Sequence, residues 1–200
     1  SNCSSLATVN YNATNCTHGG SGTGAAFYSC SNITTINIGD NVEVIPENIF
    51  NGCSGVTSIT MPSSLREIGQ FAFYGCTGLT SLTIPENVTN IATWAFYGCS
   101  GFTGTLDLSF TMAVLKKDVF RDCTGFTDLI LPLFISEIPE GAFCGCSGLT
   151  GTLILSESES LEIIGEGAFA RCSGFTGSVL PNGLREIREQ AFAGCTGFTG

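Results

Sequence analysis

Hydrophobic and polar positions recur along this 200-residue chain with a period of about 23 residues. Nine cysteines keep the register, and a Phe stands three residues before eight of them. The nine are Cys3, Cys30, Cys53, Cys76, Cys99, Cys123, Cys146, Cys172 and Cys195. Counted from each cysteine, apolar residues fall at positions +3, +6, +8, +12, +15 and +20. Such a fixed period is typical of a solenoid, whose repeats bury a core only by stacking.

The unit at 76–98, CTGLTSLTIPENVTNIATWAFYG, shows what each position predicts. Leu82 and Ile84 alternate with polar residues, which is the period of a half-buried strand. Pro85 follows and lacks the N–H that continued pairing needs. The Ala-Phe-x-Gly-Cys stretch predicts a short helical turn that ends at the glycine. We therefore expect an α/β solenoid, with a parallel β-sheet on one face and short helical or irregular turns on the other.

The spacing Leu-x-x-Leu-x-Leu is the strand signature of leucine-rich repeats. The pattern Ile-x-x-x-Ala-Phe-x-Gly-Cys stands at 68–76 and again at 187–195. The whole unit resembles the BspA-type leucine-rich repeat, and the resemblance covers residues 30–200. It implies a secreted or cell-surface protein of bacteria or protists, often linked to adhesion, with neither catalytic residues nor a cofactor.

We expect residues 1–200 to form one leucine-rich repeat solenoid of about eight repeats, each 23–27 residues long. The first repeat, 1–29, is atypical, and the C-terminal end is expected to be open. The unit from Cys99 carries one extra residue and has Ser109 where others have Pro. The unit from Cys146 carries three extra residues and an acidic run. Both departures predict loop insertions in a regular stack.

Charge and motif content argue against several function classes. The net charge is −10, with only seven basic residues and no Lys/Arg cluster of the kind that binds nucleic acid. No apolar run approaches 18 residues, so we expect no membrane insertion by this segment. His18 is the only histidine, and no catalytic or Cys-x-x-Cys metal motif accompanies it. The sequence therefore predicts a protein that is not an enzyme.

A cysteine at one fixed position per repeat favours a buried, reduced thiol over a disulfide framework. Cys16 and Cys144 break the register. A bridge between Cys3 and Cys16 would tie down the atypical first repeat, although sequence alone does not determine connectivity. Cys144 lies two residues before a register cysteine, so its side chain is expected to point away from the core as an inert thiol.

Asn-x-Ser/Thr sequons predict glycosylation if the source is a eukaryote. They lie at Asn2, Asn12, Asn15, Asn32 and Asn87. Four of the five fall in the first 39 residues, which contain no charged residue.

Two surfaces are candidate binding sites. The outward strand position +7 forms a stripe that changes from polar to apolar along the stack, and it holds Thr60, Thr83, Asp107, Ile130 and Ile154. Exposed apolar residues on one face mark binding surfaces, but β-branched residues also simply suit a sheet. The second candidate is aromatic and comprises Phe71, Tyr74, Trp94 and Tyr97 on adjacent repeats. These rings form either an exposed patch or packing between turns.

Together these features favour a non-catalytic, extracellular or cell-surface module that binds a protein or glycan ligand on another surface. The alternative is a structural subunit of an extracellular filament. In that case the solenoid ends would self-associate by head-to-tail stacking, because open ends expose strand edges.

Overall fold

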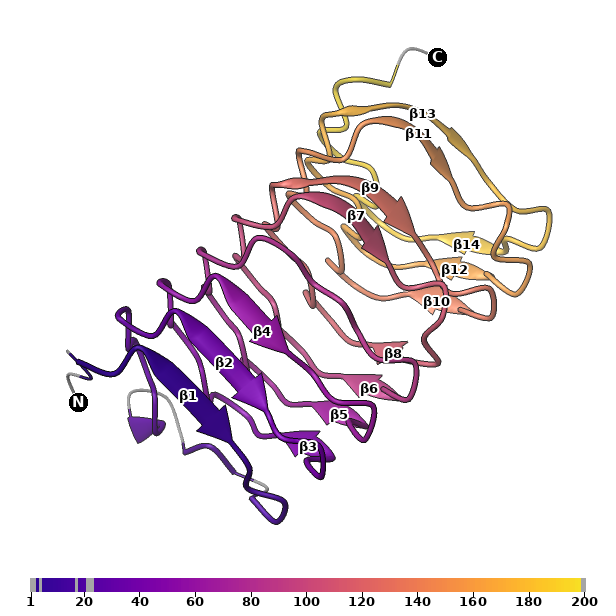
Figure 1. The fold of residues 1–200 in the computed structure, drawn as a ribbon. Coiled ribbons are helices and arrows are strands. Elements are labelled where there is room, and N and C mark those ends of the chain that lie inside the picture. Colours follow the sequence, from indigo (N-terminus) through magenta and orange to yellow (C-terminus); the bar gives the residue numbers. More distant parts are fainter. Residues whose placement is uncertain (1–2, 4, 17, 21–23, 199–200) are drawn as a thin grey trace.

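The chain forms a β-solenoid of about eight stacked turns (Figure 1). The structure is a computed structural model, and it describes residues 3, 5–16, 18–20 and 24–198. Each turn contributes up to two short strands, and all named strand pairs are parallel. The predicted solenoid with stacked parallel strands is therefore confirmed. Among the described residues, no helix has the length and hydropathy needed to cross a bilayer.

The strands lie in two rows along the stack, and short turns close the third side (Figure 1). The first strand row consists of β1 (Thr8–Tyr11), β2 (Thr35–Ile38), β4 (Ser58–Thr60), β7 (Gly104–Asp107), β9 (Phe126–Ile130), β11 (Gly151–Ile154) and β13 (Phe175–Val179). The second strand row consists of β3 (Val44–Ile45), β5 (Glu67–Ile68), β6 (Asn90–Ile91), β8 (Val114–Leu115), β10 (Glu137–Ile138), β12 (Ile163–Ile164) and β14 (Glu186–Ile187).

Neither row is one continuous sheet. The first row divides into β1-β2-β4, β7-β9 and β11-β13, and the second into β3-β5-β6-β8 and β10-β12-β14. The unit at 76–98 forms no strand in the first row, so the strand expected at Leu82 and Ile84 is absent. Its side chains still alternate, because Ile84 is buried and Thr83 is exposed.

A column of phenylalanine rings runs through the core. Successive rings lie 5.3–5.9 Å apart between centroids and are nearly parallel from Phe50 to Phe192. Phe73 and Phe96 are fully buried. The ring of each turn therefore packs on the rings before and after it, which explains why one Phe recurs at a fixed position.

A column of thiols lies beside the rings. Each register thiol from Cys53 onward donates a hydrogen bond of 3.0–3.3 Å to the carbonyl of the Phe one turn earlier. These seven cysteines are free and buried, which confirms the prediction for them. Burial raises the pKa of the Cys53 thiol to about 11, and desolvation likewise raises the pKa of Cys76 well above its usual value.

The first two register cysteines differ. Cys3 and Cys30 form a disulfide with a Cα–Cα distance of 5.3 Å. The predicted Cys3–Cys16 bridge is therefore wrong, as is the expectation that Cys3 and Cys30 are reduced. Stacking places equivalent positions of adjacent turns within the distance that a disulfide spans. The Cys16 thiol instead donates to the carbonyl of His18.

The third side consists of hydrogen-bonded turns and not of helices. Within the described residues no α-helix occurs. Two residues of most turns adopt a left-handed backbone, as in Phe71 (φ 56°) and Gly75 (φ 66°). A right-handed helix cannot continue through such residues, so the predicted helical stretch is limited to one turn between them.

Candidate binding surfaces

The structure brings the four predicted aromatic residues together on the turn side. Phe71 stacks on Trp94 and Tyr74 stacks on Tyr97, each pair with centroids 4.8 Å apart. Phe71 also meets Tyr74 edge-on at 5.7 Å. All four side chains are half-buried. The indole N–H of Trp94 donates to Asp118 Oδ2 at 3.1 Å, which fixes one end of this aromatic cluster.

Stacking between turns covers one face of each of these rings. A sugar ring packs on the face of an aromatic ring, so the stacked faces are closed to a glycan. Desolvation raises the pKa of Tyr97, and the neighbouring Asp122 carboxylate raises it further. The arrangement therefore favours packing between turns, which was one of the two interpretations left open by the sequence.

The residues of the outward stripe have different surroundings. Thr60 and Thr83 border one shallow hollow of about 390 Å³. Asp107 is engaged within the chain, because its Oδ1 accepts hydrogen bonds from the Ser109 N–H at 2.9 Å and from the Ser109 hydroxyl at 2.6 Å. This Asx turn ends the strand where other units use Pro.

Ile130 and Ile154 are exposed on adjacent turns and border a second hollow of about 200 Å³. The pairing of β11 with β13 places exposed Val179 beside Ile154, which extends this apolar stripe by one turn.

The sequons are not equally accessible. Asn12, Asn15 and Asn32 are exposed, whereas Asn2 lies outside the described residues. Asn87 is half-buried, and its side-chain amide donates a 2.9 Å hydrogen bond to the carbonyl of Ser63. The nitrogen that a glycan would modify is therefore already engaged at Asn87.

An apolar cleft, which the sequence analysis did not single out, lies at the corner between the two strand rows. Its volume is about 410 Å³, and segments 111–117 and 132–139 line most of it. Met112 and Phe134 line it with 69% and 74% of their surface exposed, and Phe110, next to lining residue Thr111 in the chain, is 79% exposed. Val114, which also lines the cleft, and Leu133, which lies between lining residues Pro132 and Phe134 in the chain, are exposed as well. We call this site the corner cleft.

The corner cleft had a signal in the sequence. In other units the residues after the first strand are polar, as in Ser63-Ser64 and Glu86-Asn87. The corresponding positions hold Leu133-Phe134 in the unit from Cys123 and Phe110-x-Met112 in the unit with the extra residue. The repeat pattern does not reveal these apolar residues, because core positions define the pattern and these residues lie in the loops.

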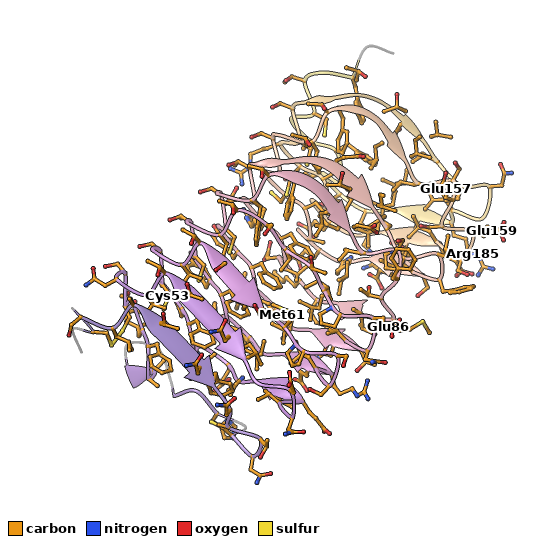
Figure 2. The ribbon with its side chains drawn as sticks, in the orientation of Figure 1. Cys53, Met61, Glu86, Glu157, Glu159 and Arg185 are labelled. Atoms are coloured by element: carbon orange, nitrogen blue, oxygen red, sulfur yellow. A yellow bond between two sulfur atoms is a disulfide. The ribbon has the colours of Figure 1, made fainter. Side chains whose placement is uncertain are left out.

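The remaining polar clusters carry no comparable chemistry. Glu157, Glu159 and Arg185 gather near one corner of the C-terminal turns (Figure 2), and Arg185 pairs with Glu162 at 3.4 Å. Among the described residues, no group of His, Cys, Asp and Glu is arranged to hold a metal. Cys144 is buried outside the main core, and its sulfur lies 3.5 Å from Arg171 Nη2.

The family model for the BspA-type leucine-rich repeat region, with six copies, matches residues 20–150 and 103–199. The chain belongs to the BspA-type leucine-rich repeat family. No curated protein matches the sequence.

Solved bacterial structures share the fold. A leucine-rich repeat protein from Bacteroides ovatus is 26% identical, with a TM-score of 0.72 over 93% of this chain and 48% of that one. A leucine-rich repeat protein of T. pallidum is 24% identical, with a TM-score of 0.65 over 90% of this chain and 73% of that one. A leucine-rich cell surface protein from Faecalibacterium prausnitzii is 21% identical, with a TM-score of 0.55 over 87% and 60%. The chain thus spans about half the length of the Bacteroides relative.

Proposed function

We propose that this BspA-type chain is a non-catalytic, extracellular binding module and that the corner cleft is its protein-binding site. The observation that carries the proposal is the exposure of Met112 and Phe134, which line one cleft, together with exposed Phe110 beside lining residue Thr111 in the chain. Monomeric proteins rarely leave several large apolar side chains exposed together unless another molecule covers them. Aromatic residues that fill pockets also dominate the energetics of protein interfaces.

Three observations support an extracellular location. The family is one of bacterial surface proteins, and one structurally similar protein is a cell-surface protein. The Cys3–Cys30 disulfide fits an oxidising environment. A binding role needs no catalytic group, and the solenoid supplies a rigid frame for surface side chains.

A protein ligand suits the corner cleft better than a glycan. Its exposed groups are largely apolar, whereas glycan sites combine open aromatic faces with convergent polar groups. The aromatic cluster at Phe71, Tyr74, Trp94 and Tyr97 is the glycan candidate, but stacking covers one face of each ring and all four side chains are half-buried.

The test compares two variants on immobilised panels of extracellular proteins and of glycans. We expect the chain to bind a protein on the panel and Phe110→Ser/Phe134→Ser to weaken that binding at least tenfold. The matched control, Tyr74→Ser/Tyr97→Ser, should leave it within about twofold. Circular dichroism confirms that both variants fold. Binding that is lost in the control and kept in the cleft variant would contradict the proposal.

A further inference from the structure

The corner cleft lies where the second strand row is interrupted. β8 pairs with β6 and β10 pairs with β12, but β8 and β10, although on adjacent turns, do not pair. The turns rejoin on both sides of the gap. Leu108 N–H donates to the Ile130 carbonyl at 2.9 Å, and Asp118 N–H donates to the Glu140 carbonyl at 2.9 Å. The opening is therefore local to this corner.

Intact pairs show which hydrogen bonds are missing. Between β3 and β5, Glu67 N–H donates to the carbonyl of Glu43 and Gly69 N–H to that of Ile45. By register, the corresponding acceptors on the β8 turn are the carbonyls of Ala113 and Leu115. Within the described residues, neither carbonyl accepts a hydrogen bond from the next turn.

A proline explains part of this gap. The residue that should donate to Leu115 is Pro139, which has no N–H. Ala113 and Leu115 are largely buried, yet both line the corner cleft. A carbonyl that lacks a partner in a largely apolar site costs free energy, and an N–H donor from another chain would recover it.

We infer that the corner cleft binds an extended, acidic–apolar peptide segment that pairs with the free edge of β8. Two alternate backbone N–H groups of the peptide donate to the Ala113 and Leu115 carbonyls. Its apolar side chains lie against Met112 and Phe134. This is strand addition to an exposed sheet edge, in which main-chain hydrogen bonds supply affinity and pockets supply specificity. The inference rests on the proposed function and specifies the partner.

The charge at the corner cleft favours a peptide that carries an acidic residue. The chain contains two lysines, Lys116 and Lys117, and both line the cleft. Lys117 is paired with Glu140. Lys116 is exposed and forms no ion pair among the described residues. A carboxylate of the peptide beside Lys116 therefore finds an unused cation on a protein that is otherwise strongly acidic.

The test uses the soluble peptide acetyl-Asp-Val-Leu-Val-Ser-amide and a version with Lys in place of Asp. Two further versions carry N-methyl groups, either on both Val amides or on the Leu and Ser amides. NMR titration of the ¹⁵N-labelled chain measures each Kd and maps the shifted amides. Because strand pairing has a period of two residues, we expect one N-methylated version to bind at least tenfold more weakly. The other should stay within threefold of the parent.

Substitution of the chain tests the charge. Lys116→Glu should weaken binding of the Asp peptide about threefold at low salt, as for an exposed ion pair. Arg66→Glu, an exposed basic residue two turns away, is the matched control and should change little.

Equal effects of the two N-methylation patterns, or shifts outside residues 111–117 and 132–139, would overturn the peptide mode. So would the absence of any peptide binding. The proposed function would then still stand if the panel protein bound through Phe110 and Phe134. Conversely, the peptide could bind in the expected pattern while no protein on the panel binds. That result would overturn the protein-binding role as tested, and pairing of a peptide with β8 would stand.

Discussion

The thiol of Cys99 donates a hydrogen bond of 3.1 Å to the backbone carbonyl of Phe73, one turn earlier in the stack. The same carbonyl accepts the N–H of Cys76 at 3.1 Å. Both acceptor positions of a fully buried carbonyl are thereby used. The cysteine therefore does more than occupy space in the core, because its S–H group forms a hydrogen bond between adjacent turns.

Replacing Cys99 with Ala should lower the free energy of unfolding by roughly 2 kcal/mol, since the change removes this hydrogen bond and leaves a small cavity. Cys16→Ala is the control, because Cys16 is half-exposed and lies outside the thiol column. It should cost less than about 0.5 kcal/mol. Urea denaturation measures both values, and equal losses would contradict a role for the thiol column.

Stability should fall with rising pH above about 8.5, where unfolded cysteine thiols ionise. Burial raises the folded-state pKa of Cys53 to about 11 and that of Cys172 to about 12. The folded chain therefore keeps protons that the unfolded chain loses. The stabilisation is fully present below the unfolded pKa and decreases by up to ~1.4 kcal/mol per pH unit for each thiol.

Urea denaturation at pH 7.5, 8.5 and 9.5 under argon tests this pH dependence. In Cys172→Ala one thiol is missing, so the loss of stability between pH 8.5 and 9.5 should be smaller by about 1 kcal/mol. A flat profile in the wild-type chain would show that these thiols ionise in the folded state as readily as in the unfolded one.

Truncation of two phenylalanines should change the free energy of unfolding by very different amounts. Phe96→Ala removes a ring from the buried column and should cost roughly 3–5 kcal/mol. Phe110→Ala removes a ring that is largely exposed, so it should change stability by less than about 0.5 kcal/mol. The melting temperatures of the two variants distinguish core from binding surface. Similar losses would mean that Phe110 packs in the fold.

Asp118 should be the most sensitive residue of the turn side. Its buried carboxylate accepts hydrogen bonds from Trp94 Nε1 and from Arg121 Nη1 at 3.0 Å. Asp118→Ala should therefore cost roughly 3 kcal/mol, because two donors lose their partner. Fluorescence of Trp94, the only tryptophan, should change as well. Asp118→Asn retains an acceptor and should lose less, and an unchanged emission spectrum in both variants would contradict this arrangement.

The core and the order of the stack followed from the sequence. Ile68, Phe73 and Cys76 recur with their equivalents at fixed spacing, and a residue that recurs once per turn must stack on its own copies. The family assignment rests on the same pattern. The predicted proximity of Phe71, Tyr74, Trp94 and Tyr97 is also seen in the structure, because equivalent positions on adjacent turns of a stack are neighbours.

Tertiary structure decided the features that depend on distances between turns. The disulfide joins Cys3 to Cys30 and not to Cys16, because stacking brings residues 27 positions apart within bonding distance. The corner cleft lies where the turn with one extra residue and the turn that holds Pro139 do not pair. A repeat pattern specifies which positions face inward, since burial follows periodicity. Whether neighbouring loops close or separate depends on backbone hydrogen bonds between turns, and only the folded stack shows which of these are made.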